Sequence, residues 1–173
     1  MRKIKGFTMI ELLIVIAVLG ILAVAVLAAI NPIEQINRSK DTGTRSDCEQ
    51  LLSGIDRFYA SKGYYPWQNA PDDGRADALN SLTNVKTLNG VLNNLVTATG
   101  ELKEAFKTKI TANDYNTIYL YNRGKQGDST YACFIPKSKA FLDEAAARCS
   151  SGMPDDFEAN CNAGSGNWYS CLP

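Results

Sequence analysis

The sequence has 173 residues, 18 basic and 18 acidic side chains, and no histidine. The absence of histidine excludes Ser-His and Cys-His catalysis and the common His-based metal sites. The length is that of one domain of ordinary size. The net charge of zero gives no reason to expect nucleic-acid binding by the whole surface.

The first 30 residues have the pattern of a membrane-inserted segment. Residues 7–30 are apolar apart from Thr8 and Glu11. As a helix they would be about 36 Å long at about 1.5 Å per residue, enough to cross a bilayer core about 30 Å thick. A short basic stretch precedes them and is expected to stay in the cytoplasm, which leaves the rest of the chain outside. Its basic residues are Arg2, Lys3 and Lys5.

Glu11 distinguishes this segment from two simpler interpretations, a cleaved secretory signal peptide and a plain membrane anchor. Signal peptides usually have an apolar region of about 7 to 15 residues, and this one is longer and contains a carboxylate. An ionisable group in a membrane helix costs free energy and is usually functional and paired. Nothing else in the segment can pair with Glu11, so we expect its partner in a neighbouring chain or in a newly created amino terminus.

The run KGFTMIELLIVIAVLGILA resembles the amino-terminal signature of bacterial type IV pilins and type II secretion pseudopilins. The resemblance implies that a prepilin peptidase cuts after Gly6 and that the new terminal residue, Phe7, is N-methylated. It also implies that Glu11 pairs with the terminal ammonium of an adjacent subunit during assembly on an inner-membrane platform. Such an ion pair lowers the cost of both charges in apolar surroundings. The likeness covers about 30 residues and continues more weakly to about Trp67.

The resulting hypothesis is a structural subunit, not an enzyme, which polymerises into a cell-surface filament. It would be stored in the inner membrane with a single crossing and its head outside, and would then enter an extracellular pilus or a periplasmic pseudopilus. One alternative is a type II secretion pseudopilin that drives protein export. An alternative from another class is a membrane-anchored extracytoplasmic binding protein.

Four parts are predicted along the chain: a leader (1–6), a transmembrane and filament-core helix (7–30), an amphipathic continuation of the helix (31–61) and a globular head (62–173). Asn31 followed by Pro32 has the pattern of a new helix start, with Asn31 as the cap.

Helical spacing predicts one apolar face on the continuation of the helix, packed on the head. Residues 37–47 contain no apolar side chain and are predicted to form a solvated neck, or a surface that meets other subunits only after assembly. Favourable four-residue ion pairs are expected from Glu34 to Arg38 and from Asp41 to Arg45. The apolar face consists of Cys48, Leu51, Leu52, Ile55, Phe58 and Tyr59.

The head is predicted to be α+β, with the long amino-terminal helix packed on a small antiparallel sheet, as in pilins, and with an unusual amount of additional helix. Gly63 is expected to end the long helix. Periodicity predicts helix over residues 76–96, 100–109 and 141–148, and strands over 117–121, 130–135 and 167–172.

Five cysteines favour a disulfide framework and an oxidising compartment. Four of them lie in the last 41 residues and allow three pairings. Short loops favour Cys133 with Cys149 and Cys161 with Cys171, and a carboxy-terminal staple agrees with the resemblance. Cys48, on the apolar helix face, is predicted to be a buried free thiol, with a bridge to the head or to another subunit as the alternative.

No cofactor and no metal site are expected. Two acidic clusters would be the place for calcium, which some pseudopilins bind, but neither matches an EF-hand loop, and solvated surface is the favoured interpretation. Five aromatic residues could form an adhesive face, although burial is favoured. The clusters are Asp72, Asp73 and Asp77, and Asp155, Asp156 and Glu158; the aromatic residues are Tyr64, Tyr65, Trp67, Trp168 and Tyr169.

Overall fold

The computed structural model describes residues 6–71, 79, 81–123, 129–149, 161–164 and 167–173. The chain divides into two compact units, Met1–Ile36 and Asn37–Pro173. The predicted acidic clusters lie outside the described residues, as do most residues of the predicted leader.

The first unit contains helix α1 (Met9–Ala29) and the start of helix α2 (Pro32–Lys62). Between them Ile30 adopts an extended conformation. The Asn31 side-chain oxygen accepts a hydrogen bond from the Glu34 N–H at 3.3 Å, so Asn31 caps the new helix. Pro32, which has no N–H to satisfy, occupies the first turn. The predicted helix restart is confirmed.

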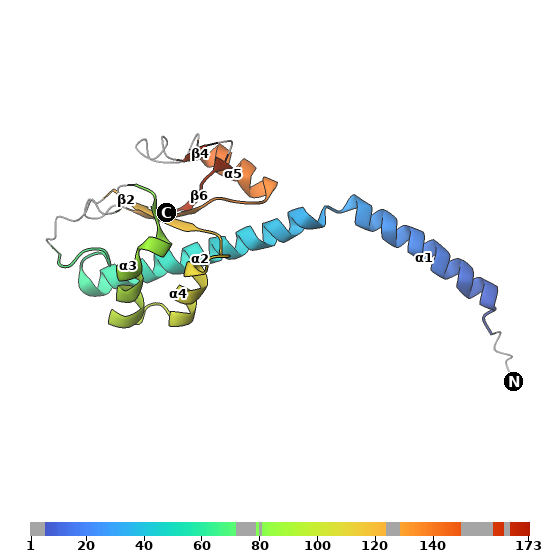
Figure 1. Ribbon diagram of the computed structural model, residues 1–173, viewed down its shortest axis with the longest axis horizontal. Coiled ribbons are helices and arrows are strands. Elements are labelled where there is room, and N and C mark those ends of the chain that lie inside the picture. The colour runs from blue at the N-terminus through green and yellow to red at the C-terminus, as the bar shows by residue number, and fades with distance from the viewer. Residues whose placement is uncertain (1–5, 72–78, 80, 124–128, 150–160, 165–166) are drawn as a thin grey trace. The chain divides into compact units, whose positions relative to one another are not determined.

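In the second unit α2 is the long element along which the head is built (Figure 1). It ends before Gly63, whose φ of +78° is readily adopted only by glycine. The predicted apolar face is buried, since Cys48, Leu51 and Ile55 have no exposed surface. Leu52 and Phe58 are also buried, and Tyr59 packs at the edge of the core.

A four-stranded antiparallel sheet has the order β1-β2-β3-β6. One face of the sheet packs on α2 in a single core cluster that includes Leu120, Phe134 and Leu172. Strand side chains alternate between faces. Leu120, Ala132 and Phe134 lie in this cluster, whereas Tyr121 and Cys133 belong to the cluster on the other face, and four of the five residues in each central strand are buried. The strands are β1 (Thr83–Asn84), β2 (Ile118–Asn122), β3 (Thr130–Phe134) and β6 (Ser170–Leu172).

The opposite face of the sheet carries a second cluster, formed by Tyr121, Cys133 and Cys171 with Cys149 and Cys161. Cys149 ends helix α5 (Lys139–Cys149), and strands β4 (Asn162–Gly164) and β5 (Asn167–Trp168) form a separate two-stranded sheet. The architecture is therefore α+β and pilin-like, with a disulfide-stapled carboxy-terminal region, as predicted.

The predicted disulfide pairing is wrong. The bridges are Cys133–Cys171 and Cys149–Cys161. Strands β3 and β6 are neighbours, and their register places Cys133 directly opposite Cys171, with the two Cα atoms 4.0 Å apart. The prediction was based on loop length, which takes no account of which strands lie side by side. Cys48 is free and buried, as predicted.

The helix predicted over residues 76–96 is also wrong for the described residues. The segment forms strand β1, a 3-10 turn η2 (Val85–Thr87), a short helix α3 (Asn89–Asn93) and a π-helical turn η3 (Asn94–Ala98). The side chain of Asn84 accepts the Lys86 N–H at 2.9 Å. Asparagine side chains compete with helix in this way, which explains why regular leucine spacing did not produce one helix.

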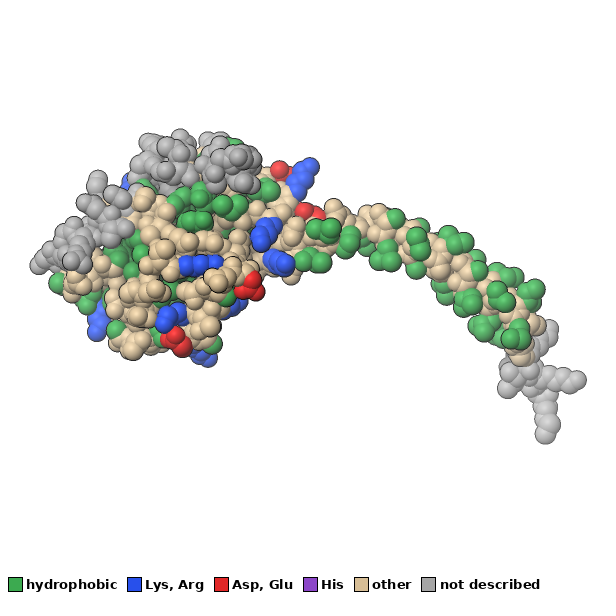
Figure 2. Space-filling model, viewed as in Figure 1, with side chains coloured by type: hydrophobic (Ala, Val, Ile, Leu, Met, Phe, Trp, Pro, Cys, Tyr) green, Lys and Arg blue, Asp and Glu red, His purple; other side chains and the backbone are tan. Residues whose placement is uncertain are grey.

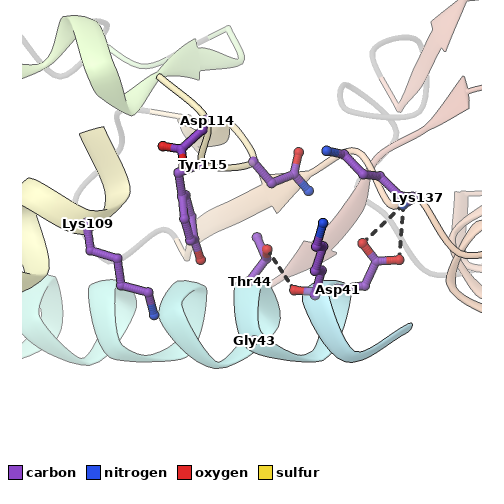
Figure 3. Close-up of a pocket in the computed structure, with 9 residues that line it drawn as sticks. Asp41, Gly43, Thr44, Lys109, Asp114, Tyr115 and Lys137 are labelled. Atoms are coloured by element: carbon purple, nitrogen blue, oxygen red, sulfur yellow. Dashed lines mark hydrogen bonds between the residues drawn. The ribbon is translucent and has the colours of Figure 1, made fainter. Parts of the chain in front are cut away.

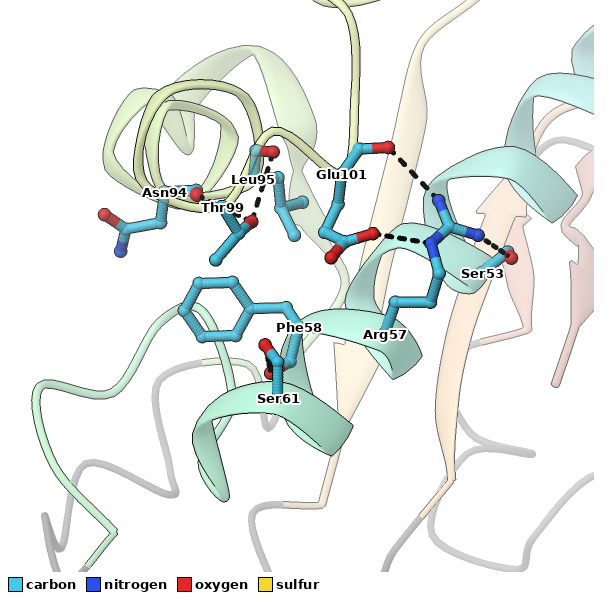
Figure 4. A network of polar contacts seen from close by, with 8 residues as sticks. All are labelled: Ser53, Arg57, Phe58, Ser61, Asn94, Leu95, Thr99 and Glu101. Carbon is cyan, nitrogen blue, oxygen red and sulfur yellow. Dashed lines mark hydrogen bonds and ion pairs between the residues drawn. The ribbon is translucent and has the colours of Figure 1, made fainter.

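Helix α4 (Glu104–Thr111) begins later than the predicted 100–109 because Gly100 has a φ of +70°. The segment before α4 is held on α2 by Arg57 (Figure 4). Arg57 Nε donates to the Glu101 carboxylate at 2.6 Å, and its terminal nitrogens donate to the Glu101 carbonyl at 3.1 Å and to Ser53 Oγ at 2.6 Å. Leu102 then packs against Gly54.

Alanine at two glycines of α2 should have opposite effects. A Cβ at Gly54 would stand 3.0 Å from Leu102 Cδ2, whereas a Cβ at Gly43 would meet nothing within 4 Å. Gly43→Ala should stabilise the head by up to ~1 kcal/mol through helix propensity. Gly54→Ala should make it less stable than Gly43→Ala by ~1–3 kcal/mol because of overpacking. Thermal unfolding of the full chain in neutral detergent measures both, and equal stability of the variants would contradict the close packing of Leu102.

Candidate functional site

The amino-terminal site consists of Gly6, Phe7, Thr8 and Glu11 at the start of α1. Phe7 is 83% exposed, and no atom lies within 4 Å of the position that a Cβ on Gly6 would occupy. Gly6 and Phe7 are therefore both exposed among the described residues. The basic residues before Gly6 lie outside the described part of the structure.

Thr8 and Glu11 form a reciprocal cap at the start of α1. The Thr8 hydroxyl accepts the Glu11 N–H at 3.3 Å. Glu11 Oε2 accepts hydrogen bonds from the Thr8 N–H at 2.8 Å and from the Thr8 hydroxyl at 2.7 Å. We expected that nothing else in the segment can pair with Glu11. The structure corrects this expectation in one respect, because Thr8 donates hydrogen bonds to the Glu11 carboxylate, although it provides no positive charge.

Helix α1 presents apolar side chains to its surroundings along its whole length (Figure 2). None of its residues is buried. Among the described residues it is the one helix that is long and apolar enough to cross a membrane, judged by length and composition alone. An unburied helix of this composition requires lipid or other apolar helices as its surroundings.

The predicted neck, residues 37–47, is not solvated all round. Its Asp41, Thr44 and Asp47 side chains are buried against the head, although its other face is exposed. Asp41 accepts the backbone N–H of Ser138 at 2.7 Å and that of Lys137 at 3.0 Å. The predicted pairing of Asp41 with Arg45 is replaced by these bonds, and Arg45 instead approaches Glu144 at 3.4 Å and Glu49 at 3.9 Å.

A second buried carboxylate, Asp47, continues this contact toward α4. Lys109 Nζ lies 2.6 Å from Asp47 Oδ2, and the Tyr115 hydroxyl donates a short hydrogen bond to the same oxygen. Burial, together with this hydrogen bond, raises the pKa of Tyr115 above its usual value, so the hydroxyl stays protonated and remains a donor. We call the contacts of Asp41 and Asp47 with the head the polar seam.

Cys48 lies beside the polar seam and has no exposed surface. Burial, with the nearby charges of Asp47 and Glu49, raises the pKa of its thiol to about 12. The thiolate is the reactive form of cysteine, so Cys48 is a packing residue at neutral pH.

The remaining predicted candidates are packing residues in the part of the chain that the structure describes. Tyr65 and Trp67 are buried and stacked with ring centroids 4.6 Å apart. Tyr64 packs on the main core, and Trp168 and Tyr169 pack on the cysteine cluster. Within the described ranges no group of three or more Cys, Asp or Glu side chains has the geometry of a metal site.

Comparison with known proteins places this geometry in context. Residues 1–27 match the model of the prokaryotic N-terminal methylation motif. The chain is 26% identical to the fimbrial protein EcpC of Eikenella corrodens over 152 residues, which cover 87% of this chain and 95% of that protein. It is 28% identical to the type IV major pilin protein PilE1 of Neisseria gonorrhoeae over 149 residues, 82% of this chain and 76% of the relative.

No solved structure matches the chain. The resemblance to type IV pilins that the first 30 residues suggested is confirmed by these comparisons. It extends through most of the head, well beyond the amino-terminal motif that carried the prediction.

The polar seam makes a prediction about Asp41. Asp41→Asn replaces one carboxylate oxygen by a donor that faces the backbone N–H groups of Lys137 and Ser138. Loss of charge-assisted bonds at a buried position should destabilise the head by ~1–3 kcal/mol. Asp56→Asn, an exposed change on the same helix, should have an effect of at most ~0.5 kcal/mol. Denaturant unfolding of the full chain measures both, and equal effects would mean that the seam adds no stability.

Proposed function

We propose that this chain, a type IV pilin-like prepilin, is cut between Gly6 and Phe7, is N-methylated at Phe7 and polymerises into a cell-surface filament. The observation that carries the proposal is the juxtaposition of an exposed Gly6–Phe7 bond with Glu11 at the start of a helix that is apolar on all sides. The methylation motif over residues 1–27 and the fimbrial and pilin relatives support it.

Before assembly the subunit is held in the inner membrane by α1. The basic leader stays in the cytoplasm and the head lies on the other side of the membrane, following the usual distribution of positive charge. A prepilin peptidase and methyltransferase acts on the leader side, and an inner-membrane platform adds subunits to the filament. The disulfides Cys133–Cys171 and Cys149–Cys161 agree with a head that folds in an oxidising compartment.

Polymerisation exchanges lipid around α1 for the α1 helices of other subunits. Cleavage creates a positive terminus at Phe7, and Glu11 supplies the opposite charge. Among the residues that the structure describes, Thr8 is the one that donates hydrogen bonds to this carboxylate, both to Oε2. An ammonium from an adjacent subunit therefore adds the charge compensation that Thr8 does not give.

The intact mass of the protein recovered from cell membranes tests the processing step. We expect a chain that begins at N-methylated Phe7 and lacks residues 1–6. Cells without prepilin peptidase provide the control. In these cells the Gly6–Phe7 peptide bond should stay intact and the leader should be retained. A chain that keeps the leader in the presence of active peptidase, or one cut near Ala25, would exclude the proposal.

Glu11→Gln separates the assembly role of Glu11 from its local capping role. Glutamine retains an oxygen that can accept the Thr8 hydrogen bonds but carries no charge. If charge pairing drives assembly, Glu11→Gln should reduce filament yield about as strongly as Glu11→Ala. Each ~1.4 kcal/mol of assembly free energy that is lost lowers the association constant about tenfold. Both variants should still enter the membrane.

Asp56→Ala, which removes an exposed acid on α2, is the matched control and should assemble normally. Sheared filaments, quantified against membrane-bound subunit by immunoblot, give the readout. Normal filament yield from Glu11→Gln would show that Glu11 acts only as a cap.

A further inference from the structure

The sequence contains a single Asn–Gly pair, Asn89–Gly90. The structure places this pair at the start of helix α3, which has five residues (Figure 1). Both residues are exposed, and a Cβ at Gly90 would meet nothing within 4 Å. The pair is therefore in contact with solvent, and no neighbour crowds the space beside Gly90.

The backbone N–H of Gly90 is available for reaction. The first N–H groups of a helix have no partner inside the helix, and no side chain caps α3. The first backbone hydrogen bond of this turn runs from the Leu92 N–H to the Leu88 carbonyl at 3.0 Å. Among the described residues neither the Gly90 N–H nor the Asn89 side-chain amide has a hydrogen-bond partner. No hydrogen bond therefore keeps these two groups apart.

Asn93 provides a comparison within the same helix. It is exposed like Asn89, but the backbone N–H that follows it, that of Asn94, donates to the carbonyl groups of Gly90 and Val91. Asn94 also has a side chain, whereas the residue after Asn89 is glycine. The nitrogen that follows Asn93 is therefore held in place and crowded, and the nitrogen that follows Asn89 is neither in the part of the chain that the structure describes.

These groups are the reactants of asparagine deamidation. The Gly90 nitrogen loses its proton to water and attacks the side-chain carbonyl carbon of Asn89. The amide nitrogen of the side chain takes up a proton and leaves as ammonia, and the ring that remains is a succinimide. Water then adds to either carbonyl carbon of the ring and breaks the bond from that carbon to the ring nitrogen. The product is aspartate or isoaspartate, and the whole reaction consumes water and releases ammonia.

We propose that Asn89 deamidates spontaneously in the folded head. The attack requires Asn89 to leave the helical conformation, but Asn89 is the first residue of its helix, and helical turns of this length have little stability of their own. Glycine places no Cβ beside the attacking nitrogen. The reaction needs only water, so it depends neither on cleavage of the leader nor on assembly.

Deamidation changes the charge beside a hollow that has an uncharged lining. Gly90 lines this hollow of about 320 Å³ together with Trp67 and Asn94, and no charged side chain belongs to its described lining. The hollow beside the polar seam differs, because lysines, Asp41 and Asp114 line it (Figure 3). A carboxylate at position 89 therefore adds a negative charge that no residue of the adjacent lining compensates.

Incubation of the full chain in neutral detergent at neutral pH tests the proposal. The solvent is water enriched in heavy oxygen, so each new carboxylate takes up a labelled oxygen. Digestion in ordinary water leaves any later reaction unlabelled, and mass spectrometry of the peptides locates the label. We expect the label to enter position 89 at least about tenfold faster than position 93, which corresponds to ~1.4 kcal/mol in activation free energy. Isoaspartate at position 89, identified by its fragment ions, is the expected sign of the succinimide.

Gly90→Ala is the matched variant. Its Cβ would meet nothing within 4 Å and alanine favours helix, so the head should keep its fold while the nitrogen of residue 90 becomes more crowded. Labelling of Asn89 should fall about tenfold or more, again ~1.4 kcal/mol in activation free energy. Gly43→Ala makes the same change at an exposed, uncrowded glycine of α2 and should leave the rate at Asn89 unchanged.

Three results would overturn the proposal. Equal labelling of Asn89 and Asn93 would show that the free nitrogen gives Asn89 no advantage. Labelling of Asn89 only after the chain is unfolded in urea would show that α3 protects the pair. Unchanged labelling in Gly90→Ala would exclude attack by the nitrogen of residue 90. The reaction involves neither the leader nor α1, so each of these results leaves the proposed filament function standing.

Discussion

The structure of the head depends on one stripe of helix α2 that changes from polar to apolar along its length. Asp41, Thr44 and Asp47 are followed on the same side by Leu51, Ile55 and Phe58, and all six are buried. The apolar part supplies the hydrophobic core against the sheet. The polar part fixes α4 and the start of α5 through Lys109, Ser138 and their neighbours.

Apolar burial is tolerant of small displacements, whereas a buried carboxylate is stable only with its partners in place. The polar seam is therefore the part of the contact that sets where the head sits on its helix.

The sequence predicted best the features that short-range chemistry determines. The apolar run, the cap at Asn31 and the stop at Gly63 follow from local rules and appear as expected. The strands predicted at 117–121 and 130–135 also appear, with bounds within one residue of β2 and β3. The mistakes concern long-range pairing. The partner of Cys133 depends on which strand lies beside β3, and the partners of Asp41 lie 96 and 97 residues away in sequence. A polar stretch without apolar side chains looks solvated until the groups that bury it are known.

The disulfide error also shows which sequence signal was available. Cys133 and Cys171 each lay within a predicted strand, whereas Cys149 followed a predicted helix. Cysteines in paired strands can face each other across the ladder, with Cα atoms close enough for a bridge. Secondary-structure context was therefore a better guide to pairing than loop length. The helix predicted for residues 76–96 failed for a related reason, since the leucine spacing is satisfied by several short turns that all face the same core.

The carboxylates of this chain fall into two groups that differ in how their charge is compensated. Asp41 and Asp47 are buried and find their partners within the head. Glu11 lies on an exposed apolar helix, and Thr8, its partner in the described part of the chain, offers hydrogen bonds without a cation. A membrane or a bundle of apolar helices gives such a carboxylate little solvation. In the proposed filament its charge would be most costly once α1 is surrounded by other apolar helices, and the charge that the proposed leader removal would create at Phe7 would be costly in the same place. On this proposal each charge lowers the cost of the other only when two subunits are correctly staggered, so the pairing would both permit assembly and select its register.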